Sequence, residues 1–193
     1  MFLKDKHSAD GVFEKFKARL VAGGDQQDKN LYENLSSPTT ATCFVMAVAA
    51  IAAAENRKVM VIDIGGAFLN AKMPSEGISV HVSLDKVMAG MLCEIDPGNR
   101  KFVCENGRMI VRLDKALYGC VEAAKLWFDD LTLKLMGHGL CANHLDVCVF
   151  NKTVNNTQLT VVVHVDDLLV TSTSKELLMD FDQYLRSVYP ETL

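Results

Sequence analysis

Three aspartates interrupt apolar stretches of this chain at positions where they could hold a metal ion. Asp63 ends the run Val-Met-Val-Ile-Asp, and the pair Asp166 and Asp167 separates two strongly apolar stretches. A lone carboxylate beside buried strands is costly to desolvate, and two adjacent carboxylates repel each other. A divalent cation removes both penalties because it becomes the largest charge in the site. The pattern is therefore compatible with two Mg²⁺ ions that promote in-line phosphoryl transfer.

The same residues also fit plain structural roles. Asp-Asp is common in turns, and a single aspartate at the end of a strand often serves as a cap. On the pattern alone, these roles are favoured over a metal site. The six cysteines offer no second metal site, because no two have the Cys-x-x-Cys spacing. We interpret them as reduced thiols, buried as small apolar side chains in an intracellular protein.

The composition is that of a folded protein. Its net charge, however, is unusual for a protein that binds nucleic acid. The chain has 193 residues, 49% of them hydrophobic and 23% charged, which suits one large domain or two small ones. Its net charge of −4 opposes binding to phosphates unless basic residues cluster locally or lie outside this chain. The longest apolar run, 43–54, is too short to cross a bilayer, and the N-terminus lacks the pattern of a signal peptide. We therefore expect no membrane partner.

The elements that must position the aspartates can be placed along the sequence. Strands at 1–7 and 12–22 form a hairpin around an Asp-Gly turn, and the second strand shows a basic stripe opposite a buried face. A largely buried helix is expected from Ser37 and Pro38 to about Asn56. A strand of buried type then leads to the first aspartate.

The second half alternates between strands and helices. The segment 72–108 predicts only weak strands and loops. A strand then precedes an amphipathic helix within 122–140, with Gly139 as its stop signal. Its apolar side carries Ala123, Trp127, Leu131 and Leu135. Three strands connected by turns at Asn155-Asn156 and Asp166-Asp167 follow, and a helix over 175–188 comes last. The order of hairpins and helices predicts an α+β fold.

Four segments in succession resemble the motif series of copia-type retrotransposon reverse transcriptases. They read FKARLVAGGDQQ, DIGGAFLNAKM, LDKALYGCVEAAKLW and HVDDLLVTS. The resemblance covers nearly the whole chain and implies a right-hand polymerase, with fingers and an antiparallel palm sheet packed on helices. It assigns residues 1–36 to a fingers hairpin and connector, and 37–193 mainly to the palm, with part of the fingers. The implied activity is RNA-directed DNA synthesis: nucleotidyl transfer from a deoxynucleoside triphosphate to a primer 3′-hydroxyl.

The resemblance also implies roles for individual residues. Asp63, Asp166 and Asp167 correspond to the catalytic aspartates that hold two Mg²⁺ or Mn²⁺ ions, with the Ile64 carbonyl as a further ligand. Phe68 corresponds to the aromatic residue beneath the nucleotide sugar. The remaining positions match nucleotide contacts at Lys17, Arg19, Gly66, Ala67 and Glu122, and primer-terminus contacts at His164 and Val165.

Three features depart from the family pattern. His164 stands where Tyr is usual, and Glu122 stands where Gln is usual, which puts an acidic group near the expected triphosphate. The chain also lacks the thumb and RNase H regions, and we expect a fragment of a polyprotein or a decayed copy. Expected partners are a primed RNA or DNA template, deoxynucleoside triphosphates and the rest of a Pol polyprotein, including integrase. The location would be cytoplasmic, in a virus-like particle, or nuclear. The alternative is a transposon-derived remnant that folds or binds but does not polymerise.

Overall fold

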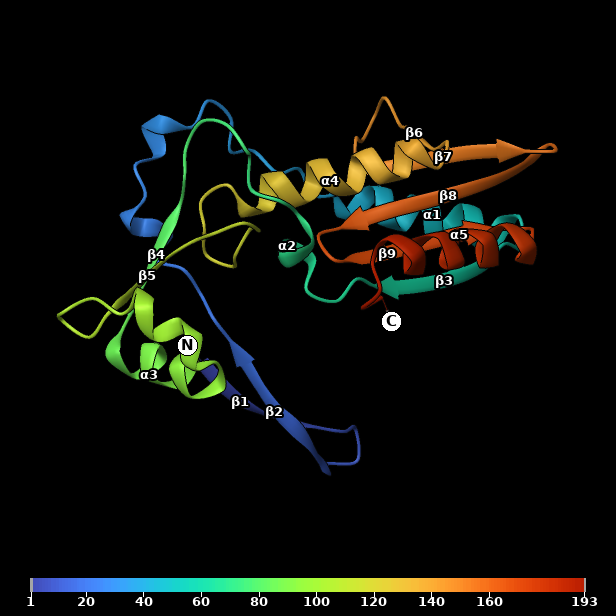
Figure 1. The fold of residues 1–193 in the computed structure, drawn as a ribbon. Coiled ribbons are helices and arrows are strands. Elements are labelled where there is room, and N and C mark those ends of the chain that lie inside the picture. The colour runs from blue at the N-terminus through green and yellow to red at the C-terminus, as the bar shows by residue number, and fades with distance from the viewer. Residues whose placement is uncertain (1, 193) are drawn as a thin grey trace. The chain divides into compact units, whose positions relative to one another are not determined.

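The computed structural model describes residues 2–192, which fall into two units, each made of two stretches of chain (Figure 1). The first unit contains the residues up to Glu33 together with Lys72–Ala123, and the second contains Asn34–Ala71 and the residues from Ala124 onward. Every strand pair in the described chain is antiparallel. The predicted mixture of helices and antiparallel strands is therefore confirmed. The assignment of 37–193 mainly to the palm, with part of the fingers, stays a prediction, and the structure groups Lys72–Ala123 with the first hairpin in one compact unit.

The second unit is built on a five-stranded sheet with the order β3-β9-β8-β7-β6. Its strands are β3 (Lys58–Asp63), β6 (Cys141–Ala142), β7 (Val149–Val154), β8 (Thr157–His164) and β9 (Asp167–Ser172). Asn155 and Asn156 both have positive φ, 47° and 61°, as the predicted tight turn between β7 and β8 requires. The sheet order places β3 at an edge. Its Val59 and Val61 are 56% and 67% exposed, so the prediction of a buried strand was wrong.

Three helices cover this sheet: α1 (Thr42–Ala54), α4 (Ala123–Gly137) and α5 (Lys175–Val188). Val48 of α1 packs with Val149 and Val162 on one face of the sheet. Alternate strand residues point to the other face, and these are buried as well, including Val161 and Val170. Both faces are therefore covered. The predicted apolar side of α4 is confirmed, because its four residues Ala123, Trp127, Leu131 and Leu135 are at most 2% exposed.

Helix α1 differs from its prediction in two respects. It begins at Thr42, not at Pro38, and its N-cap residue Ala41 supplies no side-chain cap. Asp146 replaces that cap by accepting bonds from the Thr40 hydroxyl at 3.0 Å and the Ala41 amide at 3.2 Å. The helix also packs by one side only. Its Met46 is 65% exposed, so it is not the largely buried helix that its composition predicted.

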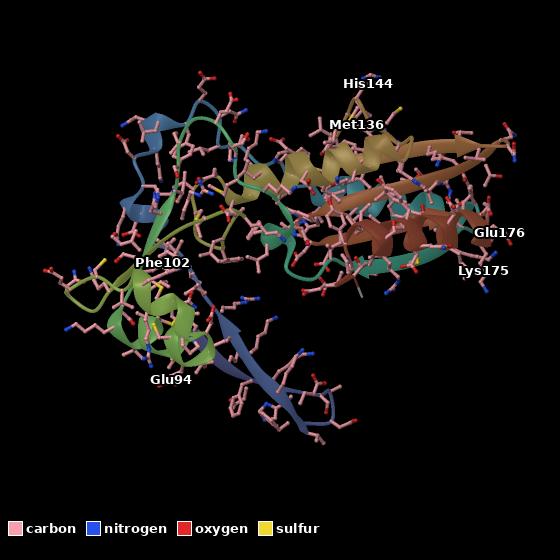
Figure 2. All side chains as sticks on the ribbon, viewed as in Figure 1. Glu94, Phe102, Met136, His144, Lys175 and Glu176 are labelled. Carbon is pink, nitrogen blue, oxygen red and sulfur yellow. The ribbon has the colours of Figure 1, made fainter. Side chains whose placement is uncertain are left out.

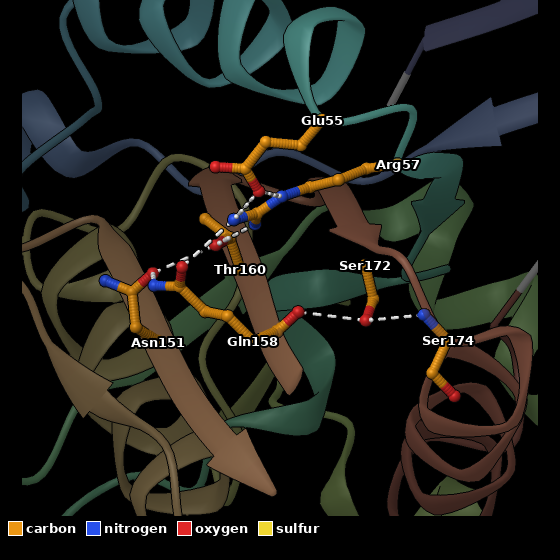
Figure 3. Close-up of polar contacts among 7 residues, drawn as sticks. All are labelled: Glu55, Arg57, Asn151, Gln158, Thr160, Ser172 and Ser174. Atoms are coloured by element: carbon orange, nitrogen blue, oxygen red, sulfur yellow. Dashed lines mark hydrogen bonds and ion pairs between the residues drawn. The ribbon is translucent and has the colours of Figure 1, made fainter. Parts of the chain in front are cut away.

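A polar network fixes one end of the sheet (Figure 3). The Arg57 guanidinium, whose side chain is 6% exposed, donates to Glu55 at 2.8 Å, to Thr160 at 3.1 Å and to Gln158 at 3.0 Å. Asn151 accepts from both Gln158 and Thr160. These bonds tie the start of β3 to β8 and β7. Because a slip of one residue would turn every side chain to the other face, this network helps to set the register of the whole sheet.

The first unit contains two hairpins and a small core. Strands β1 (Phe2–His7) and β2 (Phe13–Arg19) form the predicted hairpin, but every residue in them is exposed. The prediction of one buried face was therefore wrong, because neither face of this two-stranded ribbon is covered in the described structure. Strands β4 (His81–Leu84) and β5 (Met109–Arg112) pair beside α3 (Lys86–Ile95), a helix that the sequence did not predict. Their core is Leu84, Ala89 and Met109.

Short elements complete the chain. They are the 3-10 helices η1 (Gly24–Gln26), η2 (Lys29–Leu31) and η3 (Pro97–Phe102), and the short helix α2 (Ala67–Asn70). None of the helices in the described residues is long and apolar enough to cross a membrane.

Exposed side chains include charged, polar and apolar types. The residues labelled in Figure 2 are all exposed: Glu94, Phe102, Met136, His144, Lys175 and Glu176. Three of the six cysteines, Cys43, Cys104 and Cys141, are exposed too. The prediction of buried thiols was therefore wrong for these three, because Cys43 and Cys141 lie on exposed sides of α1 and β6 and Cys104 lies in the loop before β5.

Candidate catalytic site

Three polar residues lie in a row at one end of strands β3, β9 and β8. Asp63 of β3 lies opposite Asp167 of β9, and Asp167 lies opposite His164 of β8. Directly opposite residues on antiparallel strands share a face. The Ile64 amide donates to the Asp166 carbonyl at 3.0 Å, which makes Asp63 and Asp167 a non-hydrogen-bonded pair, the kind whose side chains approach most closely. The sheet thus brings two predicted catalytic aspartates side by side.

The third predicted aspartate lies in the turn between β8 and β9. This turn has two central residues, Val165 and Asp166, so the predicted turn at Asp166-Asp167 is displaced by one residue. Val165 has a φ of 60° and Asp166 has no positive φ, which is the pattern of a type II′ turn. Glycine normally occupies the first position of such a turn. A β-branched residue there is strained, at a cost of about 1–3 kcal/mol.

Two hydrogen bonds hold the carbonyl groups of this turn. The indole N–H of Trp127, a residue 2% exposed, donates to the Val165 oxygen at 2.7 Å. The Ile64 amide holds the Asp166 oxygen from the β3 side. The strained turn is therefore fixed from α4 on one side and from the end of β3 on the other.

The predicted catalytic aspartates Asp63, Asp166 and Asp167 are all exposed at the rim of the sheet. The desolvation argument made from the sequence therefore does not apply to them. Within residues 2–192, no three His, Cys, Asp or Glu side chains gather into a group able to hold a metal ion. Their hard oxygen donors still suit Mg²⁺, which usually takes one or two carboxylates and completes its shell with water and substrate phosphates. The donor chemistry and the strand register fit such an ion, although the side chains form no closed cage.

The segment after Asp63 is close to the C-terminal residues of the second unit. The Gly65 amide donates to the Glu191 carbonyl oxygen at 3.2 Å. A Cβ on Gly65 would lie 2.6 Å from that oxygen, so glycine is required at this close approach. Gly66 has a φ of 61° and precedes α2. Phe68 is half-buried and so is not a fully enclosed core residue. The predicted nucleotide contacts of Gly66, Ala67 and Phe68 stay predictions, as does the Ile64 carbonyl as a metal ligand.

The predicted basic contacts belong to the first unit. Lys17 lies opposite Lys4 in the β1–β2 register, and the Arg19 guanidinium lies over the Tyr118 ring at 5.7 Å. Lys6 and Lys15 form a second cross-strand pair on the same face, although Lys6 also meets Glu14. The basic face therefore comprises Lys4, Lys6, Lys15, Lys17 and Arg19. Like charges directly opposite one another destabilise a hairpin, so an anion on this face would relieve the repulsion.

Glu122, a predicted nucleotide contact, is enclosed within the first unit. It is 6% exposed, and its carboxylate accepts from the Gln27 side chain at 3.0 Å and from the Tyr32 hydroxyl at 3.2 Å. The Gln27 oxygen in turn accepts from the Val121 amide at 2.8 Å. Burial, and then the charge of Glu122, raise the pKa of Tyr32. This carboxylate is therefore occupied by protein donors that join two of the sequence motifs, and its nucleotide role stays a prediction.

Two neighbouring glycines make that junction possible. A Cβ on Gly24 would lie 2.0 Å from the Gly119 oxygen, and one on Gly119, whose φ is 94°, would lie 2.3 Å from the Ala22 oxygen. The Ala22 amide donates to the Tyr118 oxygen at 2.7 Å. Gly24 of the first motif and Gly119 of the third are thus required by backbone contact.

Sequence reasoning did not assign three of these residues to the site: Gln27, Tyr32 and Trp127. Trp127 was predicted only as part of an apolar stripe, because its indole N–H carries no positional signal in the sequence. Gln27 lies in a quoted motif, but its partner Glu122 is distant in the chain. His164, by contrast, is exposed, which removes the core interpretation of that residue and leaves the primer contacts of His164 and Val165 as predictions.

The chain is similar to known proteins along almost its whole length. The family model for Reverse transcriptase (RNA-dependent DNA polymerase) matches residues 2–190. The Retrovirus-related Pol polyproteins from transposons RE2 and RE1 of Arabidopsis thaliana are each 28% identical over 174 residues, which is 90% of this chain and 11% of theirs. That from transposon TNT 1-94 of Nicotiana tabacum is 24% identical over 177 residues, 91% of this chain and 12% of its own. The chain therefore spans only a small fraction of these relatives. No solved structure matches it.

Proposed function

This chain belongs to the family of reverse transcriptases (RNA-dependent DNA polymerases), and we propose that it is the fingers-and-palm part of a copia-type Pol polyprotein that adds deoxynucleotides to a primer. The observation that carries the proposal is the register of β3, β9 and β8. It sets Asp63 beside Asp167, with Asp166 in the adjoining turn. Carboxylates on neighbouring strands at one end of the sheet suit the two-metal chemistry of phosphoryl transfer.

Asp63, Asp166 and Asp167 would hold two Mg²⁺ or Mn²⁺ ions, with the Ile64 carbonyl as a further ligand. When bound, these ions would activate the primer hydroxyl and neutralise the leaving pyrophosphate. The exposure of the three carboxylates supports this role, because substrate phosphates and water can reach them.

The protein's own residues would bind and orient the substrates. Lys17 and Arg19 on the basic face would contact the triphosphate, and the local charge offsets the net charge of −4. Gly66 and Ala67 would offer backbone amides, and Phe68 would lie beneath the sugar. His164 and Val165 would meet the primer terminus.

The proposed partners are a primed template, deoxynucleoside triphosphates and the remaining parts of a Pol polyprotein, among them integrase, thumb and RNase H. The names of the relatives support this setting, since each is a transposon Pol polyprotein. The proposed location is intracellular, in a cytoplasmic particle or the nucleus.

The test is the dependence of metal binding and nucleotide addition on the aspartates. Mn²⁺ is titrated by calorimetry, with a deoxynucleoside triphosphate and a primed RNA template, into the wild type and an Asp63→Asn, Asp166→Asn double variant. Addition of one nucleotide to the primer is measured in parallel. Asp10→Asn is the matched control, because Asn suits the turn between β1 and β2 equally well. We expect the double variant to lose both Mn²⁺ binding and nucleotide addition. The control should keep both.

Equal Mn²⁺ binding by the wild type and the double variant would contradict the metal site. Binding of metal and primed template without nucleotide addition would favour the alternative, a remnant that binds but does not polymerise.

A further inference from the structure

The β8–β9 turn needs external support, because its conformation is unfavourable for its own sequence. Val165 is a β-branched residue at a φ of 60°. Such a conformation persists only where the surrounding structure imposes it. Asp166 and Asp167 follow it directly, so whatever holds the Val165 peptide also orients the two aspartates.

The support comes from a buried side chain on α4. The Trp127 indole N–H donates to the Val165 carbonyl at 2.7 Å. Trp127 is 2% exposed, so its packing in the core fixes the indole N–H where it meets the Val165 carbonyl. An indole has one donor and no acceptor, and in this structure that donor is directed to the strained peptide.

Two more residues hold the indole itself. The Tyr189 ring contacts it edge-on, with centroids 5.3 Å apart and planes at 62°. The Tyr189 hydroxyl donates to Asp130 Oδ2 at 2.7 Å, and Asp130 lies one turn beyond Trp127 on α4. Tyr189 is 2% exposed. We name Trp127, Asp130 and Tyr189 the indole bracket.

The indole bracket is also connected to the end of β3, on the other side of the turn. Beyond Tyr189, the Glu191 oxygen accepts from the Gly65 amide, and Thr192 forms a bridge with Ile64. The Ile64 amide holds the Asp166 carbonyl. The segment after α5 therefore connects the bracket to the end of β3, immediately after Asp63.

From these contacts we infer that Trp127 is a positioning residue for Asp166 and Asp167, acting through the Val165 peptide, with Tyr189 and Asp130 locking the indole in place. The expected effect of Trp127 on metal binding rests on the proposed function. The hold on the turn itself is a property of the fold. Trp127 does not need to touch substrate to act in this way.

The test removes one hydrogen-bond donor and leaves the packing intact. Trp127 is replaced by β-(3-benzothienyl)alanine, in which sulfur stands in place of the indole N–H, giving the variant Trp127→benzothienylalanine. Tyr184→Phe is the matched control, because the Tyr184 hydroxyl donates to the Lys134 carbonyl at 2.8 Å and so also joins α5 to α4, but away from the turn. Amide hydrogen exchange is measured at Asp167 and in the centre of β8. Mn²⁺ affinity is then measured with nucleotide present.

We expect exchange at Asp167 to quicken and Mn²⁺ affinity to fall by about three- to tenfold, the range that one neutral hydrogen bond supplies. The centre of β8 should be unchanged, and Tyr184→Phe should resemble the wild type in both measurements. Tyr189→Phe, which keeps the ring but loses its bond to Asp130, should give a smaller effect in the same direction. It also keeps the inference testable if the benzothienyl variant does not fold.

The inference would be overturned if the Asp167 amide exchanged at the wild-type rate in both the benzothienyl variant and Tyr189→Phe. If the wild type and Asp166→Asn bind Mn²⁺ equally, the proposed function fails instead, while the exchange comparison still decides whether Trp127 holds the turn. Faster exchange with unchanged, aspartate-dependent Mn²⁺ affinity would overturn the positioning role and leave the proposed function standing.

Discussion

Asp63 and Asp167 are direct neighbours across strands β3 and β9, in a pair without hydrogen bonds between them. Like charges directly opposite each other on antiparallel strands are destabilising, and within residues 2–192 neither carboxylate forms an ion pair with a basic side chain. The pair therefore opposes folding in the absence of a cation.

We expect Asp167→Asn to stabilise the metal-free protein, because it removes this repulsion. The gain should be about 0.2–1 kcal/mol in the free energy of unfolding, measured by urea denaturation with a chelator. With Mn²⁺ and nucleotide the order should reverse, since the wild type gains more from binding. Asp10→Asn is the control for loss of one negative charge. A wild type more stable than Asp167→Asn in chelator would contradict the expected repulsion.

Phe68→Val separates a role at the sugar from a role in packing. Phe68 is half-buried, so the variant should lose roughly 1 kcal/mol or less of stability. If the ring lies beneath the sugar, the ratio of deoxyribonucleotide to ribonucleotide affinity should fall several-fold, where tenfold equals about 1.4 kcal/mol. Leu69→Val, on the exposed side of the same helix, is the control. Lower stability with an unchanged sugar preference would argue for packing alone.

Glu122→Ala should destabilise the first unit. It leaves the Gln27 amide and the Tyr32 hydroxyl without their acceptor, at a cost of about 1–3 kcal/mol in chemical denaturation. Glu122→Gln should lose less, because its amide oxygen can still accept one bond. Glu105→Ala, at an exposed acidic residue in the same unit, serves as the control. Equal losses for Glu122→Ala and Glu105→Ala would show that the buried bonds add nothing.

The stability of the second unit should fall in mild acid because of His138. This ring stacks on Tyr184 with centroids 4.2 Å apart. Burial, and then the charge of Lys152, lower the pKa of His138, although Asp180 acts in the opposite direction. The unfolded chain therefore binds more protons as the pH drops from the ordinary histidine value of about 6.5 towards the folded pKa. Stability should decline through that window and then level off.

Urea denaturation between about pH 7.5 and 5 measures this decline. We expect a smaller decline in His138→Phe, which keeps a ring beside Tyr184 and cannot take up a proton. His144→Phe, at an exposed position, should follow the wild type. An identical pH dependence for His138→Phe and the wild type would rule out this histidine as the cause.

Five of the six cysteines should react with a thiol reagent in two groups. Cys43, Cys104 and Cys141 are exposed and should be labelled rapidly in the native protein. Burial raises the pKa of the Cys148 thiol to about 11 and raises that of Cys120 as well, so both lack thiolate and access. Peptide mapping after brief labelling should find these two modified only in denaturant. Rapid native labelling of Cys148 would contradict its burial.

Many local elements and the family could be predicted from the residues alone. The turns at Asp10-Gly11 and Asn155-Asn156 fixed two hairpins, because few residues tolerate the backbone angles of such turns. The spacing of Trp127 and Leu131 gave the buried side of α4, since helical periodicity reports which residues share a face. The ordered motifs were enough to identify a reverse transcriptase.

Contacts between residues distant in the chain could not be predicted from the sequence. The pairing of Asp63 with Asp167, the bond from Trp127 to Val165 and the enclosure of Glu122 by Gln27 join segments far apart in the chain. Apolar composition also overstated burial in α1 and β3, because burial depends on whether another layer covers a side chain. A local pattern records backbone preference and periodicity, whereas strand order, register and side-chain partners follow from the packing of the whole unit.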